Sequence, residues 1–347
     1  MNIAKAITTI LLGYCITTGA QTIDYSHWQA RLNDDTPIAA LSIPGAHDAA
    51  TGEGLHCIAG FGKTQELTLS ELWESGIRAF DLRPAIDGTT LHIYHGIIKT
   101  RITFDKAISI ITGKLREQPT EFAIVLLREE SDSENDKEKA LWPRAIGECI
   151  AALGDTAAYF SPTMTVADLR GKILFLSRDR YTGTDKGATI TGWSHSAQGT
   201  KTATVSAHAG NAQLQVQDYY NTTSRQRQQA KANAILRFIE LANKATPATW
   251  TINFLSAYSN TWMGITPFAT TAGYKRNACT QHPTVVASLT AQEHHRRHTG
   301  ILFMDYAGTE YAPAGLWHWS RFCTQGKTLV ELIIEQNFTN GNLPDNR

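Results

Sequence analysis

Two histidines and one arginine each follow a short apolar run in the first third of the chain. His47 comes after the apolar run 39–43, Arg83 after 77–82, and His95 after 91–94. In parallel α/β barrels the ends of the strands carry the catalytic side chains. We therefore expect these three side chains to meet at one rim of such a barrel.

This set of side chains suits the cleavage of a phosphodiester. The reaction needs a base for the attacking hydroxyl, an acid for the leaving alkoxide and a cation for the phosphate charge. Histidine can serve as either acid or base, because its unperturbed pKa lies near neutrality. A guanidinium is permanently charged and matches pairs of phosphate oxygens.

The sequence around these residues resembles the bacterial phosphatidylinositol-specific phospholipase C family. The likeness rests on Ser-Ile-Pro-Gly-Ala-His-Asp at 42–48, Gly-Ile-Arg-Ala-Phe-Asp-Leu-Arg at 76–83 and His-Ile-Tyr-His-Gly at 92–96. It continues in the same order through 122–130, 171–178, 216–220 and 304–306. The resemblance implies a metal-independent phosphatidylinositol diacylglycerol-lyase that releases diacylglycerol and inositol 1,2-cyclic phosphate.

The resemblance also implies a role for each residue. His47 would be the general base for the inositol 2-hydroxyl, and His95 the general acid for the diacylglycerol oxygen. Arg83 would contact the phosphate. Asp305 would orient His47 and stabilise its charged form, as an aspartate does in other histidine pairs. Asp48 would assist His95 and the leaving group.

Two neighbouring residues leave alternatives open. Asp81 matches the family motif and is expected to support the hydrogen-bond network, with a structural ion pair to Arg83 as the alternative. His92 precedes His95 by two residues and shares its strand face if the strand is regular. The motif places the catalytic histidine directly before Gly96, which favours His95.

Further residues at predicted strand ends would bind the inositol ring. Charged groups would serve its hydroxyls, and a tyrosine would offer an aromatic face. This substrate-binding set is Arg128, Glu130, Arg178, Asp218 and Tyr220. The family usually has lysine where this chain has Arg128, so that match is weaker.

Arg83 also leads us to expect no metal and no cofactor. Calcium requires several oxygen ligands around one point, and a calcium-using branch of the family has an acidic residue at this position. Two other functions stay open. One is a metal-dependent glycerophosphodiester phosphodiesterase, which would need a carboxylate cluster. The other is an inactive inositol-lipid binding module, against which the intact His47, His95 and Asp305 argue.

Eight apolar runs, several of them separated by helical patterns, predict an α/β fold: a single distorted parallel (β/α)8 barrel of the TIM type. The predicted strands are 39–43, 77–82, 91–94, 122–127, 173–177, 214–217, 250–255 and 301–304. A capping box at Thr68 and Glu71 predicts a helix start, and helices are also expected at 102–115, 225–244 and 331–338. Residues 181–210 predict a long loop with a hairpin, and the charge run 129–139 predicts a solvated loop that enters a helix.

The charges of the chain balance. Lys+Arg and Asp+Glu both number 32, so the formal net charge is zero. A neutral protein has no overall field to attract nucleic acid, and contact with a membrane must be local. Trp262, in the apolar loop 260–268, is the candidate for contact with phosphatidylinositol membranes, with 55–61 as a second stretch and ordinary packing as the alternative. We expect a monomer.

The first twenty residues predict an export signal. Lys5 supplies the basic start, 6–18 is mostly apolar, and small residues follow at 18–20. The catalytic barrel would span 21–347, and the protein would be secreted or periplasmic, with a lipoprotein anchor at Cys15 as the alternative. In an exported chain the remaining cysteines could pair or stay as buried thiols. They are Cys57, Cys149, Cys279 and Cys323.

Overall fold

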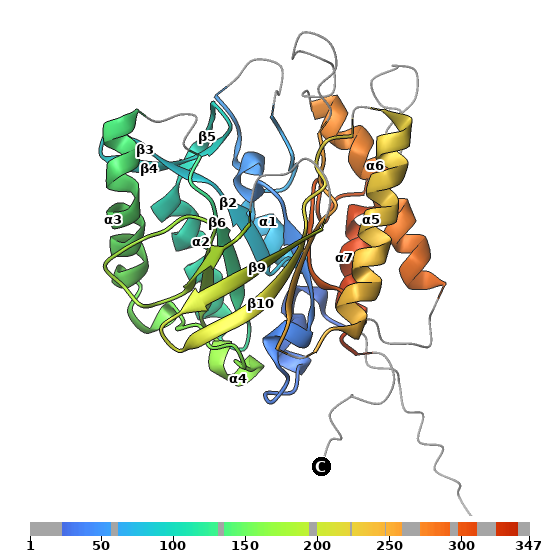
Figure 1. Ribbon diagram of the computed structural model, residues 1–347, viewed down its shortest axis with the longest axis horizontal. Helices are drawn as coiled ribbons and strands as arrows, with labels where there is room; N and C mark the ends of the chain where they lie inside the picture. Colours follow the sequence, from blue (N-terminus) through green and yellow to red (C-terminus); the bar gives the residue numbers. More distant parts are fainter. Residues whose placement is uncertain are drawn as a thin grey trace, which may run out of the picture.

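The computed structural model describes residues 23–56, 62–130, 135–193, 200–222, 224–246, 248–258, 271–291, 298–310 and 324–338. Within these ranges nine strands close into one barrel, in the order β1-β12-β11-β10-β9-β8-β7-β6-β2. Three further strands form a separate sheet, in the order β3-β4-β5. The barrel, the small sheet and the surrounding helices are shown in Figure 1. The predicted distorted barrel is confirmed.

Most neighbouring barrel strands are parallel, and β9 is the exception. It runs antiparallel to both β8 and β10. Residues 208–209 alone join β9 to β10, so these two strands must be antiparallel. The long loop predicted at 181–210 is wrong where β8 and β9 form, and the hairpin expected within that range is the antiparallel pair of β8 with β9, which forms part of the barrel wall. The barrel strands are β1 (Ser42–Ala46), β2 (Ala79–Leu82), β6 (Ala123–Leu127), β7 (Ile173–Ser177), β8 (Ala188–Thr191), β9 (Thr200–Ala207), β10 (Gly210–Gln217), β11 (Trp250–Phe254) and β12 (Gly300–Met304).

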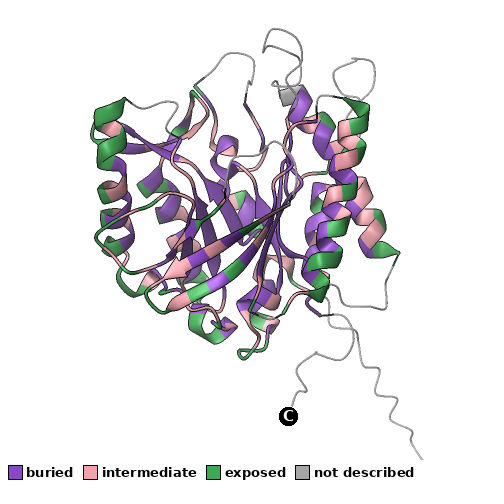
Figure 2. Cartoon of the chain, in the orientation of Figure 1, coloured by how far each residue is buried: buried purple, intermediate pink, exposed green. Residues whose placement is uncertain are grey.

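Six of the barrel strands are buried along their whole length, as expected for strands whose two faces are both covered. Every residue of β1, β2, β6, β7, β11 and β12 is buried. Figure 2 shows the buried strands inside and exposed residues on the outer sides of the helices. The core thus holds the strand ends, and the residues that follow them, in fixed positions.

The predicted barrel strand at 91–94 is wrong. The chain forms β4 (Thr90–His95) there, but β4 pairs antiparallel with β3 (Pro84–Asp87) and β5 (Ile98–Thr103). Two-residue connections on both sides of β4 leave no room for the crossover that a parallel neighbour requires. His95 is therefore carried by the small sheet and not by a barrel strand.

The first barrel strand begins three residues later than predicted. A short 3-10 helix, η2 (Ile38–Ala40), replaces the start of the predicted run, and β1 includes Pro44 and Gly45. The Pro44 carbonyl accepts a hydrogen bond from the backbone N–H of Arg78 at 3.1 Å. A Cβ at position 45 would lie 2.8 Å from the Phe303 ring, so glycine allows close packing inside the barrel. The Pro-Gly pair lies within the strand and does not end it.

The helices cover the outside of the barrel. Figure 1 shows α2 and α3 on one side of it, and α5, α6 and α7 on the other. They are α1 (Leu69–Glu74), α2 (Phe104–Glu117), α3 (Asp136–Ala152), α4 (Val166–Leu169), α5 (Arg225–Lys244), α6 (Thr271–Thr290) and α7 (Gly326–Glu335), with 3-10 turns η1 (Tyr25–Arg31), η3 (Ala49–Glu53) and η6 (Gly154–Thr156).

The helix signals in the sequence are partly confirmed. The predicted capping box is present: the backbone N–H of Glu71 donates to Thr68 Oγ1 at 3.3 Å, and the backbone N–H of Thr68 donates to Glu71 Oε2 at 2.8 Å. The helix after the charge run and the one at 225–244 are also confirmed. The last helix begins at Gly326 and not at 331, and α6 was not predicted.

Several predictions fall outside the described residues. They concern the export signal at 1–20 with Cys15, the loop that contains Trp262, and Cys57 and Cys323. Cys149 is a free thiol. Of the helices that the structure describes, none has the length and apolar character needed to span a membrane.

Candidate active site

His47 and Asp305 follow the ends of two adjacent parallel strands. The pairing of β1 with β12 reaches Ala46 opposite Met304, and the next residue on each strand is His47 or Asp305. His47 Nδ1 lies 2.8 Å from Asp305 Oδ1. An ionised carboxylate only accepts hydrogen bonds, so Nδ1 carries the proton in this pair. His47 Nε2 then carries the lone pair that a base needs.

Arg83 lies at the centre of the site. Its Nη2 donates to His47 Nε2 at 2.8 Å and to Asp81 Oδ2 at 3.0 Å. Its Nε lies 2.8 Å from Asp48 Oδ1, and its Nη1 lies 3.6 Å from Glu130 Oε2. The bond from Nη2 confirms that His47 Nε2 is an acceptor.

His95 reaches the same place from β4. Its Nδ1 donates to the Gly62 carbonyl at 2.6 Å. Its Nε2 lies 3.3 Å from Asp48 Oδ2, and His47 Nε2 lies 3.2 Å from the same oxygen. The two imidazoles therefore face one carboxylate oxygen from different elements of the fold. The Tyr274 hydroxyl lies 3.5 Å from His95 Nε2.

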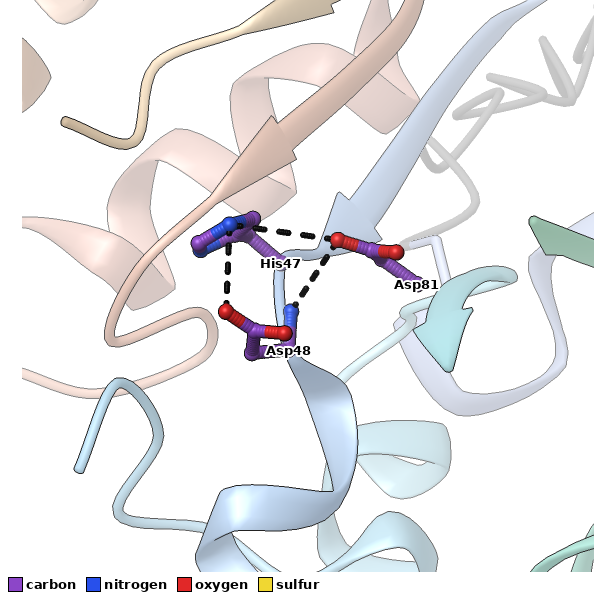
Figure 3. A group of neighbouring side chains, drawn as sticks. All are labelled: His47, Asp48 and Asp81. Carbon is purple, nitrogen blue, oxygen red and sulfur yellow. Dashed lines mark hydrogen bonds and ion pairs between the residues drawn. The ribbon is translucent and has the colours of Figure 1, made fainter. Parts of the chain in front are cut away.

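Asp48 has an unusual backbone. Its φ of 43° is in the left-handed region, which costs a non-glycine residue roughly 1–2 kcal/mol. The Asp48 backbone N–H donates to Asp81 Oδ2 at 3.4 Å. Figure 3 shows the side chains of His47, Asp48 and Asp81 turned toward one another. The strained turn thus directs the carboxylate into the site.

The charges of the site shift the pKa values of its members. Burial raises the pKa of Asp48, but Arg83 and the two histidines outweigh burial and lower this pKa to about 2. Burial lowers the pKa of His47, but the carboxylates of Asp48 and Asp305 outweigh it, and the pKa is raised overall. Burial raises the pKa of Asp305. Because its pKa is lowered to about 2, Asp48 is ionised at neutral pH.

Three of these residues have a spacing that could suit a cation. His47, Asp48 and Asp81 each offer one ligand atom, and these atoms lie within 4.8 Å of one another. Arg83 already donates to His47 and Asp81 and contacts Asp48 at 2.8 Å. Because a metal ion would lie against a permanent positive charge, this donor set fits the guanidinium and does not fit a metal.

Four of the predicted ring-binding residues surround the cluster. Arg128 Nη2 lies 3.9 Å from Glu130 Oε1, and Glu130 contacts Arg83. The Arg178 guanidinium lies 4.1 Å from the centre of the Trp193 ring. Trp193 Nε1 donates to Asp218 Oδ2 at 3.2 Å. Trp193 thus links Arg178 to Asp218.

The fifth predicted residue, Tyr220, is placed differently. It stacks on Tyr258, with ring centres 5.4 Å apart. Among the described residues, Tyr220 makes no hydrogen bond or ion pair with the cluster. It can offer an aromatic face, but the structure does not bring it into contact with the side chains of His47, Arg83 and His95.

The sequence did not identify three aromatic residues of the site. Trp193 lies in the stretch 181–210, for which the sequence predicts a loop with a hairpin, and its only signal is a large aromatic side chain in a polar segment. Phe254 packs its ring edge-on to His47, with ring centres 5.8 Å apart. Tyr274 belongs to α6, which was not predicted, and no motif marks it.

Comparisons with known proteins support the resemblance seen in the motifs. A 1-phosphatidylinositol phosphodiesterase from Listeria monocytogenes is 30% identical over 168 residues, which are 46% of this chain and 50% of that protein. The match thus spans about half the length of this relative. No family model matches the chain.

Solved structures of bacterial phosphatidylinositol-specific phospholipases C share the fold. The enzyme from Listeria monocytogenes has a TM-score of 0.66 and 25% identity, and covers 90% of this chain and 99% of its own. A double mutant of the Staphylococcus aureus enzyme has a TM-score of 0.69 and 20% identity, and the match covers 92% of this chain and 98% of that enzyme. The resemblance to this family is confirmed.

The pairing of His47 with Asp305 can be tested by a titration. Asp305→Asn removes one of the two carboxylates that raise the His47 pKa, while the burial that lowers it remains. The His47 pKa should therefore fall, measured by NMR of the ring C–H signals as pH is varied. His92, whose pKa is set by its own burial and by Lys99, should not move and is the internal control. A His47 pKa that stays constant or rises would contradict the pairing.

Proposed function

We propose that this protein is a phospholipase C that cleaves phosphatidylinositol, without a metal, to diacylglycerol and inositol 1,2-cyclic phosphate. One observation carries the proposal: two imidazole Nε2 atoms, of His47 and His95, lie 3.2 and 3.3 Å from one Asp48 oxygen, beside Arg83. The activity named for the relatives supports the choice of substrate.

His47 is the base in this proposal. Its Nε2 takes the proton of the inositol 2-hydroxyl as that oxygen attacks the phosphorus. Asp305, 2.8 Å from Nδ1, fixes the tautomer and stabilises the imidazolium that forms. Arg83 Nη2, which donates to His47 Nε2 in the free protein, must release this bond to the phosphate before His47 can accept the proton.

His95 is the acid. It starts with a proton on both ring nitrogens, one of them held by the Gly62 carbonyl. Its Nε2 proton passes to the glycerol oxygen as the bond from phosphorus to that oxygen breaks. The ionised Asp48 stabilises the cationic form of His95 before this transfer. No water is consumed, because the 2-hydroxyl oxygen replaces the glycerol oxygen on phosphorus.

The ring is held on the side of Arg178 and Asp218. Charged groups hydrogen-bond the inositol hydroxyls, and Trp193 keeps Arg178 and Asp218 in fixed positions. Arg128 and Glu130 add charged groups next to Arg83, because Glu130 contacts both arginines. Tyr220, stacked on Tyr258, offers a flat face for the ring.

A metal-dependent phosphodiesterase is the alternative that the assay must exclude, although Arg83 already contacts the three possible ligands His47, Asp48 and Asp81. A binding module without activity is the other alternative. The two are separated from the proposal by one assay on phosphatidylinositol vesicles.

We also propose that the protein is exported and acts as a monomer. Lys5 and the apolar run 6–18 support export. His47, Asp48, Arg83, His95 and Asp305 contact one another within a single chain, so the proposed reaction needs no residue from a second copy.

The assay follows the products by phosphorus NMR with EDTA in excess. We expect the cyclic phosphate to appear first and the acyclic phosphate only later, at a rate unaffected by the chelator. Arg83→Lys should lose most of the activity although the charge remains, because the bidentate fork is lost. Activity that EDTA abolishes and calcium restores would support the metal-dependent enzyme, and no turnover would support the binding module.

The bilayer should lie on the side of His95. The group that His95 protonates is diacylglycerol, which stays in the bilayer. The β4–β5 turn follows His95 directly, and its tip, Ile97, is 79% exposed, more than the other large apolar side chains that the structure describes. We therefore propose Ile97 as a membrane contact in addition to Trp262, which lies outside the described residues.

Ile97→Ser should weaken binding to phosphatidylinositol vesicles by up to about tenfold, because part of one isoleucine leaves the apolar phase. Turnover of a water-soluble headgroup ester should stay the same. Leu241→Ser is the matched control. Leu241 is also exposed, but it lies near the C-terminal end of α5, which leads to the start of β11. The site lies beyond the other ends of the barrel strands. Equal loss on both substrates, or equal vesicle binding by both variants, would contradict the contact.

A further inference from the structure

Gln65 joins the ends of the two strands that carry His47 and Asp305. Its side chain is fully buried. Its Nε2 donates to the His47 carbonyl at 2.8 Å and to the Met304 carbonyl at 2.9 Å. Its Oε1 accepts from the backbone N–H of Ala307 at 3.0 Å. Both amide hydrogens and the amide oxygen are therefore bound to the backbone of these two segments.

The two segments share an uncommon backbone geometry. Asp48 has a φ of 43° and Tyr306 a φ of 51°, and among the described residues no other non-glycine residue has a positive φ. Each directly follows a member of the His47–Asp305 pair. Such conformations persist only where the surroundings hold them.

Gln65 binds the peptide units next to both strained residues. The His47 carbonyl belongs to the peptide that precedes Asp48, and the Ala307 N–H to the peptide that follows Tyr306. The ladder between β1 and β12 ends at Ala46 and Met304. The Gln65 amide thus continues the connection between the strands beyond the last ladder pair.

Thr64 adds to this connection. Its hydroxyl lies 3.3 Å from the carbonyls of both His47 and Asp48. Its own carbonyl accepts from the Tyr306 N–H at 2.7 Å. The dipeptide 64–65 therefore lies between the two segments and contacts both.

We propose that Gln65 is a positioning residue for the reaction: by binding both segments it holds the His47 ring and the Asp305 carboxylate at hydrogen-bond distance. This inference rests on the proposed function, in which His47 is the base. Gln65 does not touch the substrate in this account. It acts on the reaction through the backbone of the catalytic pair.

The test is Gln65→Met, which keeps the length of the side chain and removes the amide. A small displacement of a catalytic group can lower turnover by about a hundredfold, so we expect kcat to fall by about ten- to a hundredfold with KM nearly unchanged. The acid limb of the kcat/KM profile should move to lower pH, because the Asp305 carboxylate raises the His47 pKa only while it is aligned.

The charged groups that face His47 remain in this variant. They are Asp48, Asp81, Arg83 and Asp305, with His95 across the Asp48 carboxylate. A shift of the acid limb would therefore report a change in their geometry and not in their number.

Gln29→Met is the matched control. Gln29 is also fully buried, and its Oε1 accepts from the backbone N–H of Phe122 at 2.7 Å, just before β6 begins. This variant should lose stability but keep the wild-type pH profile. A Gln65→Met variant that behaves like Gln29→Met would show that Gln65 is only structural and overturn the inference.

Two further measurements keep the test decisive. If Gln65→Met does not fold, Thr64→Val removes a hydroxyl that contacts the same His47 carbonyl, and its acid limb should shift in the same direction by a smaller amount. An unchanged limb in Thr64→Val would contradict the inference. NMR titration of His47 in the variants needs no turnover, so it tests the positioning even if phosphatidylinositol is not the substrate.

Discussion

The buried guanidinium of Arg83 is the interaction on which the site depends. It contacts the carboxylates of Asp48, Asp81 and Glu130 and donates to the imidazole of His47. Burying an unpaired charge costs several kcal/mol, so each of these groups depends on the others to remain charged. The surrounding carboxylates hold the pKa of Arg83 well above its usual value, although burial opposes this.

The fold brings the proposed base, His47, and the proposed acid, His95, to this arginine by different routes. His47 and Asp305 come from adjacent barrel strands, and their pairing is fixed by the strand ends and by Gln65. His95 comes from the small antiparallel sheet, which lies outside the barrel ladder. Asp48 joins the two routes, because one of its carboxylate oxygens faces both imidazoles. The acid and the base can therefore be altered separately by mutation.

Part of this arrangement could be predicted from the sequence. Continuous apolar runs identify strands covered on both faces. Arg83 and Asp305 directly follow such runs, and His47 follows one after three further residues. The run before His95 was assigned to the wrong sheet, because a short apolar run does not show which neighbours it pairs with. The strand predicted at 39–43 stops before the Pro-Gly pair at 44–45, because the tight packing of Gly45 against Phe303 depends on a residue distant in the chain.

Other parts of the site had no usable signal. Gln65 acts through backbone groups of segments that are close to it only after folding, and a single glutamine does not indicate such a role. Trp193 links Arg178 to Asp218 from a position two residues after β8, in a segment that carries no motif. Helix α6 contains Pro283 and shows no clear apolar period, so the sequence predicted neither this helix nor the place of its residue Tyr274 in the site.

The central claim is that His47 and His95 carry out two separate proton transfers in one reaction. The most direct measurement compares His47→Ala and His95→Ala on phosphatidylinositol and on an inositol phosphate ester of nitrophenol. Each variant should lose about a hundred- to ten-thousandfold on the lipid. Nitrophenolate leaves without a proton, so His95→Ala should recover much of its rate on the ester, and His47→Ala should not. Recovery by His47→Ala would reverse the two roles, and equal loss by both variants on both substrates would contradict the separation of acid from base.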